Sequence, residues 1–90
     1  MRRVRCYDNG GLTADRYTVV WLKPFKAMGQ KYWVVASMSE EPQHPLGVWG
    51  TTEMSHCPDV EGEHNKRIPF RKLPERCQQL VKDFGREDWP

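Results

Sequence analysis

Apolar residues are densest in the stretch 16–38 of this 90-residue chain. Two segments rich in β-branched and aromatic residues, Arg16–Leu22 and Lys31–Met38, flank a connection, Lys23–Gln30, that contains a proline and a glycine. Such segments are typical of β-strands, and such a connection is typical of a loop. The pattern therefore predicts a strand, a loop and a strand, most simply an antiparallel hairpin.

Neither predicted strand alternates cleanly between apolar and polar residues. Tyr17, Val19 and Trp21 share one face of the first strand, yet Val20 and Leu22 lie on the other face. A hairpin with one wet face would alternate. We therefore expect both faces to be covered and the hairpin to lie at the centre of the core.

Shorter elements are expected on either side of the hairpin. Arg2–Tyr7 predicts a first strand, and the turn-forming residues 8–11 (Asp-Asn-Gly-Gly) would let it pair antiparallel with Arg16–Leu22. Leu46–Trp49 is compatible with a short strand. Lys66–Lys72 is confined by Pro69 to an edge strand or an extended connection.

The clearest helix is predicted from Pro74 to Phe84. Proline suits the first helical position, and Gly85 provides a stop. Leu73, Cys77, Leu80, Val81 and Phe84 form one apolar face at helical spacing. The chain is thus expected to be one domain, residues 1–90, of the α+β class: a small antiparallel sheet of three to four strands with one C-terminal helix packed on it.

Composition indicates a cytoplasmic protein with a small core. No apolar run approaches the ~20 residues that span a membrane, and the N-terminus lacks the apolar segment of a secretory signal. Cys6, Cys57 and Cys77 suggest no disulfide framework and are expected to be reduced. A core this small leaves room for stabilisation by a partner, a metal or a homodimer.

Charge is distributed in blocks. Residues 1–35 carry net +5, residues 36–64 net −6 and residues 65–90 net +3. Either the acidic segment folds back over basic strands and the fields cancel, or patches of opposite sign steer charged partners.

Three kinds of chemistry are conceivable from the residue types, and the sequence favours none of them. His44, His56, Cys57 and His64 match no usual zinc-ligand spacing, so His56, Cys57 and His64 are weak metal candidates only. Cys57 beside His56 lacks a recognisable oxyanion site, and Cys77 is expected to be a small hydrophobic residue of the helix face. Asp8 is expected to cap its turn, and Asp15 to pair with Arg16 or end a strand. The sequence favours a protein without catalytic residues or cofactor, with zinc as the open alternative.

Basic residues near aromatic ones suggest an alternative, a nucleic-acid-binding module. Stacking platforms beside a basic sheet face would come from Trp21, Tyr32 and Trp33. The pI of about 8.5 is below the level expected of a dedicated binder. The basic candidates are Arg2, Arg3, Arg5, Lys23, Lys26 and Lys31.

Several short motifs occur along the chain: Tyr7-Asp8-Asn9-Gly10-Gly11, Asp15-Arg16-Tyr17-Thr18-Val19-Val20, Met38-Ser39, His44-Pro45, Lys66-Arg67-Ile68, Leu73-Pro74, Cys77-Gln78 and Leu80-Val81. Taken together, they resemble a group of short proteins from tailed bacteriophages and environmental phage genomes. The group has Gln-Gly after the His-Pro pair, where this chain has Leu46-Gly47. The resemblance implies a phage origin, action in the host cytoplasm and, by analogy, a binder that blocks host machinery such as a CRISPR or other antiviral defence system.

The leading hypothesis is therefore a non-enzymatic protein that binds a host protein or ribonucleoprotein complex. Carboxylates of the acidic segment would mimic the charge that a basic groove attracts, and tryptophans would supply contact area. The expected contact residues are Glu40, Glu41, Trp49, Glu61, Glu63 and Trp89. A nucleic-acid-binding module and a zinc-stabilised or hydrolytic protein remain the alternatives.

Overall fold

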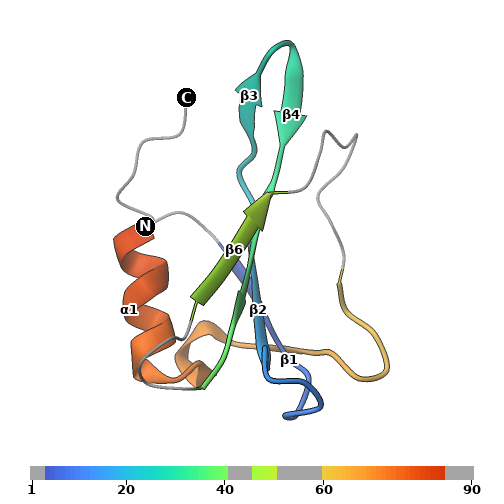
Figure 1. Cartoon of the computed structure of the whole chain (residues 1–90), viewed down its shortest axis with the longest axis vertical. Coiled ribbons are helices and arrows are strands. Elements are labelled where there is room, and N and C mark those ends of the chain that lie inside the picture. The colour runs from blue at the N-terminus through green and yellow to red at the C-terminus, as the bar shows by residue number, and fades with distance from the viewer. Residues whose placement is uncertain (1–3, 41–45, 51–59, 85–90) are drawn as a thin grey trace.

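A computed structural model describes residues 4–40, 46–50 and 60–84. It shows a small α+β fold, with an antiparallel sheet and one C-terminal helix, as predicted (Figure 1). The five hydrogen-bonded strands of the main sheet lie in the order β6-β5-β2-β1-β7. Their bounds are β1 Val4–Asp8, β2 Tyr17–Trp21, β5 Val34–Met38, β6 Leu46–Gly50 and β7 Lys66–Ile68.

The central pairing predicted from the sequence is confirmed. Strand β2 pairs antiparallel with β5, from Tyr17 opposite Met38 to Val20 opposite Val35, and with β1 on its other side. The short strand expected near Leu46 is present as β6. Lys66–Ile68 pairs with β1 as an edge strand of the sheet. An edge position tolerates the following Pro69, which has no backbone N–H to donate.

One face of the sheet packs against helix α1, Glu75–Phe84, which follows a 3₁₀ turn, η1, at Phe70–Lys72. The helix begins one residue later than predicted: Pro74 precedes its first residue, Glu75, and the Pro74 carbonyl accepts the first helical bond from the Gln78 amide. Cys77 and Val81 of the predicted apolar face are fully buried. The buried residues of this core are Cys6, Tyr17, Val19, Trp21, Val34, Ala36, Met38, Leu73, Cys77 and Val81.

The opposite face of the sheet is also buried. Tyr7, Val20 and Val35 lie there at 2% exposure or less, and Val60 packs against them. The incomplete alternation of the strands therefore reflects two covered faces, as expected from the sequence.

The predicted loop 23–30 is wrong, because the connection contains a second, two-stranded sheet. Strands β3, Phe25–Ala27, and β4, Gln30–Tyr32, pair antiparallel around a Met28-Gly29 turn. Both turn residues have positive φ, 54° and 77°, which matches the tight turns that close two-residue hairpins. The predicted strand Lys31–Met38 is accordingly divided at Trp33.

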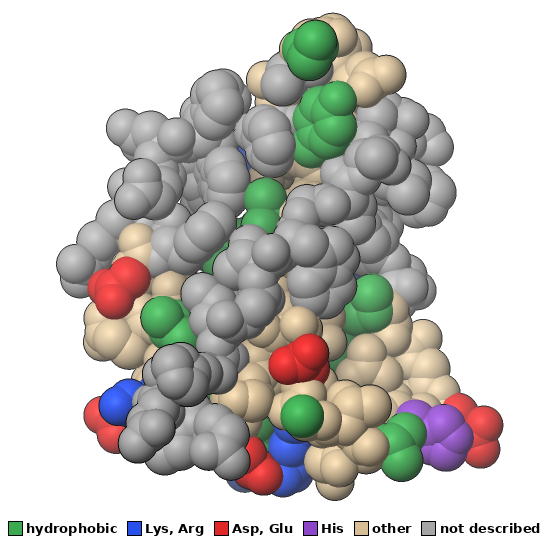
Figure 2. Space-filling model, viewed as in Figure 1, with side chains coloured by type: hydrophobic (Ala, Val, Ile, Leu, Met, Phe, Trp, Pro, Cys, Tyr) green, Lys and Arg blue, Asp and Glu red, His purple; other side chains and the backbone are tan. Residues whose placement is uncertain are grey.

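The register gives the molecule two distinct ends. Asp8 lies opposite Tyr17, and Tyr17 opposite Met38, so the β1–β2 loop and the residues after β5 meet at one end. The β3–β4 ribbon projects from the other end (Figure 1). Acidic side chains of the described residues that are visible in Figure 2 lie in the half away from that ribbon.

No helix among the described residues has the length and apolar character needed to cross a membrane.

Candidate functional site

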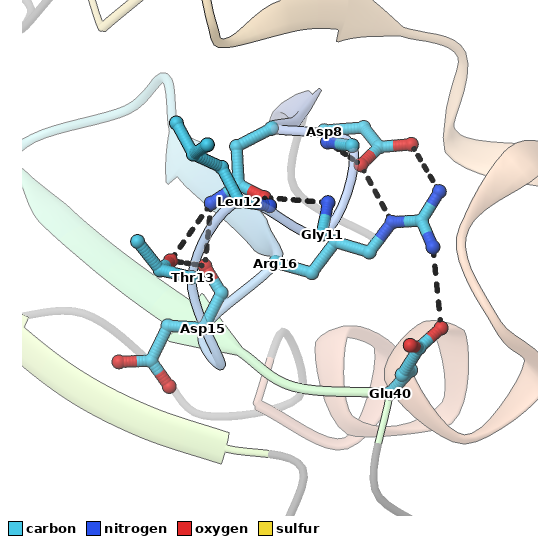
Figure 3. A network of polar contacts seen from close by, with 9 residues as sticks. Asp8, Gly11, Leu12, Thr13, Asp15, Arg16 and Glu40 are labelled. Atoms are coloured by element: carbon cyan, nitrogen blue, oxygen red, sulfur yellow. Dashed lines mark hydrogen bonds and ion pairs between the residues drawn. The ribbon is translucent and has the colours of Figure 1, made fainter.

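The β1–β2 loop is organised by the side chain of Asn9. The backbone also closes the loop, since the Asn9 amide donates to the Arg16 carbonyl at 3.0 Å. The hydrogen bonds of Asn9 hold the loop in one shape, although the loop has no hydrophobic core of its own (Figure 3). The Asn9 amide oxygen accepts from the backbone N–H groups of Gly11 (2.9 Å) and Leu12 (3.0 Å), and its Nδ2 donates to Thr13 Oγ1 (2.8 Å) and the Asp15 carbonyl (3.2 Å).

Arg16 joins this loop to the segment after β5. Its Nε donates to Asp8 Oδ1 at 2.8 Å and its Nη2 to Asp8 Oδ2 at 3.1 Å, a two-pronged pair. Its Nη1 donates to Glu40 Oε2 at 3.3 Å, and its Cζ lies 5.2 Å from the centroid of the Tyr17 ring. Bonding to Arg16 lowers the pKa of Asp8, and the same bond raises the pKa of Arg16.

The two aspartates of the loop have different roles. Asp8 caps its turn as predicted, because its Oδ1 accepts from the Gly10 amide at 2.7 Å. The expected pairing of Asp15 with Arg16 is wrong, since the Asp15 carboxylate points away from the guanidinium, which is bound to Asp8 (Figure 3). Asp15 contributes its backbone carbonyl to the loop instead.

Two shallow recesses flank the loop, each of about 280 Å³. The first lies between the loop and Glu40, and Leu12 lines it. The second lies between the Asp8–Gly10 turn and the segment that carries Glu63, His64 and the basic Lys66. Leu12 is 66% exposed although its backbone is fixed by Asn9. We call this surface, made of loop 9–15 with Glu40 and Glu63, the acidic end.

The structure brings some of the predicted contact residues together and leaves others undescribed. Glu40 and Glu63 lie on either side of the loop, and Glu61 is exposed in the same segment as Glu63. Trp49 occupies a position in strand β6 opposite Val35. Glu41 and Trp89 lie outside the described residues.

The basic candidates are divided between two places. Lys23, Lys26 and Lys31 are exposed on the β3–β4 ribbon and the segment leading to it. Arg5 is half-buried in β1 and lines a recess of about 480 Å³ with Arg67. Arg2 and Arg3 lie outside the described residues.

The expected aromatic stacking platforms are not available at two of the three positions. Trp21 is 1% exposed and Trp33 is 6% exposed, because both rings pack into the interior. Tyr32 is half-buried, and its hydroxyl donates to Gln30 Oε1 at 2.8 Å. The expectation that Trp21 and Trp33 serve as stacking platforms is therefore wrong.

Metal-ligand candidates are not assembled within the described ranges. There, no group of three or more His, Cys, Asp and Glu side chains is placed to hold a metal ion. His64 is exposed, with its Nε2 3.9 Å from Glu63 Oε2. His44, His56 and Cys57 lie outside the described residues.

Two of the cysteines are core residues. Burial raises the pKa of Cys6 to about 11, with a smaller opposing effect from Arg67, and burial also raises the pKa of Cys77. Cys77 Sγ donates to the Ser39 carbonyl at 3.6 Å. Both thiols stay protonated at neutral pH, so the prediction of Cys77 as a small hydrophobic residue is confirmed.

Sequence reasoning overlooked the two large hydrophobic side chains that the described structure exposes, Leu12 and Met28. Each is a single apolar residue beside a glycine in a turn, at the tip of a hairpin. An apolar residue beside a turn glycine could have indicated these exposed side chains, but hydrophobic periodicity takes no account of isolated apolar residues.

The fold and the surface together define a small α+β domain with an acidic end and a basic ribbon. Comparison with protein-family models, curated proteins and solved structures found no match for the chain.

Proposed function

We propose that the protein is a non-enzymatic binding module that docks its acidic end onto a basic surface of another protein. The observation that carries this proposal is the exposed Leu12, whose backbone is held by Asn9 and which lines a recess with Glu40, while Glu63 lines the second recess of the same loop. An exposed apolar side chain beside charged residues is an arrangement found at interfaces.

The rigidity of the loop supports this proposal. A loop fixed by five hydrogen bonds of Asn9 loses little conformational entropy when it binds, and that entropy is a main cost of association. Carboxylates at Asp15, Glu40 and Glu63 would steer a positively charged partner toward Leu12. The partner chemistry is therefore a cationic protein surface with a small apolar depression.

A phage origin, implied by the sequence resemblance, gives this chemistry a biological setting. Host complexes that handle nucleic acid present basic grooves, and CRISPR effectors are among them. We propose that the protein acts in the host cytoplasm and occupies such a surface, so that it inhibits the complex without a cofactor.

Affinity capture with matched charge variants tests the proposal. The tagged protein is used on bacterial lysate beside a double variant, Glu40→Lys and Glu63→Lys, and bound proteins are identified by mass spectrometry. A control double variant, Glu75→Lys and Asp83→Lys, makes the same charge change on exposed positions of α1. We expect a partner that is lost with the first pair and retained with the second. Equal retention or equal loss in the two variants would place the contact elsewhere.

A further inference from the structure

The β3–β4 ribbon is separate from the main sheet, and it carries an exposed apolar tip. Its two strands hydrogen-bond to each other and form a sheet of their own, which projects beyond the body of the molecule (Figure 1). Met28 at the tip is 96% exposed, with φ of 54°. A methionine in the left-handed region, pointing into solvent, contributes nothing to the core and costs backbone strain.

Two lysines of the ribbon face each other across the strands. Lys26 lies directly opposite Lys31, so both side chains are on one face, and both are exposed. Like charges at directly opposed positions destabilise a ribbon. Within the described part of the chain neither lysine forms an ion pair. Such an arrangement becomes favourable when an anion lies between or along the two ammonium groups.

All charged residues in the sequence around the ribbon are basic. No Asp or Glu occurs between Asp15 and Glu40, whereas Lys23, Lys26 and Lys31 fall within this interval. The ribbon therefore projects net positive charge, and the acidic end lies at the opposite end of the sheet. A polyanion would bind the ribbon without repulsion from the carboxylates of the acidic end.

The size of the ribbon matches a groove of duplex DNA. Three residues per strand at ~3.3 Å per residue give a length of about 10 Å. The major groove is about 12 Å wide and about 8.5 Å deep, and it admits a two-stranded ribbon. In the major groove an apolar side chain can contact the methyl group of thymine.

We propose that the β3–β4 ribbon is an arm that enters the major groove of double-stranded DNA. Lys26 and Lys31 contact phosphates along the groove, and Met28 contacts the bases at its tip. Phosphate contacts carry no sequence information, so the binding is largely independent of sequence. This activity uses the end of the molecule remote from the acidic end, and it does not depend on the function proposed above.

Fluorescence anisotropy with a short labelled DNA duplex tests the arm directly. We expect binding at about 50 mM salt that weakens steeply toward about 200 mM. The double variant Lys26→Gln and Lys31→Gln should weaken binding about tenfold or more and reduce the slope of log K against log salt by about 1.8. The control variant Lys72→Gln and Lys82→Gln, at exposed positions near and on α1, should retain wild-type binding.

A variant of the tip separates contact from folding. Met28→Gly removes the side chain at a positive φ that glycine adopts freely, so the fold should be as stable as in the wild type. We expect its duplex affinity to fall several-fold with an unchanged salt slope. Absence of binding at low salt, equal loss in the control variant, or preference for single-stranded DNA would overturn the proposal. Self-association through the ribbon in place of DNA binding, seen by sedimentation, would overturn it as well.

Failure of the arm and failure of the acidic end are distinguishable. The acidic-end variant Glu40→Lys and Glu63→Lys leaves the ribbon intact, so its duplex affinity should not decrease. A protein that captures its partner but binds no duplex would refute the arm alone.

Discussion

The Arg16 guanidinium donates two hydrogen bonds, of 2.8 and 3.1 Å, to the Asp8 carboxylate across the mouth of the β1–β2 loop. The same guanidinium reaches Glu40, which follows the neighbouring strand β5. A single arginine thus ties three chain segments into the acidic end. The partner-binding surface proposed here depends on this arrangement, and the following predictions test its parts.

Stability is expected to depend on Asp8 in acid. Bonding to Arg16 lowers the folded-state pKa of Asp8 below its ordinary value of about 3.9, so the ionised form stabilises the fold above that value. This stabilisation should be lost as the pH falls through the folded pKa. Chemical unfolding at a series of pH values measures the loss, and Asp8→Asn should flatten the curve below about pH 4. An unchanged acid dependence in Asp8→Asn would show that another carboxylate dominates.

The two loop aspartates should differ in their contribution to stability. Asp8→Ala removes the paired bonds from Arg16 and the cap on the Gly10 amide, and it should lower the free energy of unfolding by about 1–2 kcal/mol. Asp15→Ala keeps the backbone carbonyl that the loop uses, so it should cost no more than about 0.5 kcal/mol. Urea denaturation of both variants provides the comparison. Equal effects would contradict the roles assigned to the two carboxylates.

Two methionines offer a matched test of the core. Met38 is fully buried against α1, and Met38→Ala should cost about 2–5 kcal/mol. Met28 is exposed at the ribbon tip, and Met28→Ala should change stability by less than about 0.5 kcal/mol. Thermal unfolding of the two variants distinguishes them. A large loss in Met28→Ala would mean that the ribbon tip is packed.

Thiol labelling reports on the sheet and helix together. In a Cys57→Ser background, only Cys6 and Cys77 can react, and both are buried with raised pKa values. Labelling with a thiol reagent near pH 8 should therefore be slow in the native protein and fast in denaturant. Rapid stoichiometric labelling without denaturant would contradict the packing of α1 on the sheet.

The central strands and the helix could be predicted because their patterns are long. The Val-Val pairs of β2 and β5 and the apolar face of α1 repeat over several positions, and the buried residues follow those repeats. The glycine-rich turn after Asp8 could be predicted equally well, since glycine readily adopts the positive φ found there.

The ribbon and the acidic end were less accessible to sequence reasoning. A three-residue strand such as β3 has too few positions to show a hydrophobic period. The turn beside it was not predicted, because methionine is not a residue that usually indicates a turn with positive φ. The partner of Arg16 is Asp8 and not its neighbour Asp15, because antiparallel pairing brings residue 8 beside residue 17. Only the register fixes that choice.

Site-specific crosslinking tests the central proposal, the acidic end as a docking surface, most directly. A photoreactive residue in place of the exposed Leu12 should crosslink to a basic protein in bacterial lysate. The same residue in place of Gln79, exposed on α1, serves as the control and should give no such product. Identical products from both positions, or none from position 12, would contradict the account.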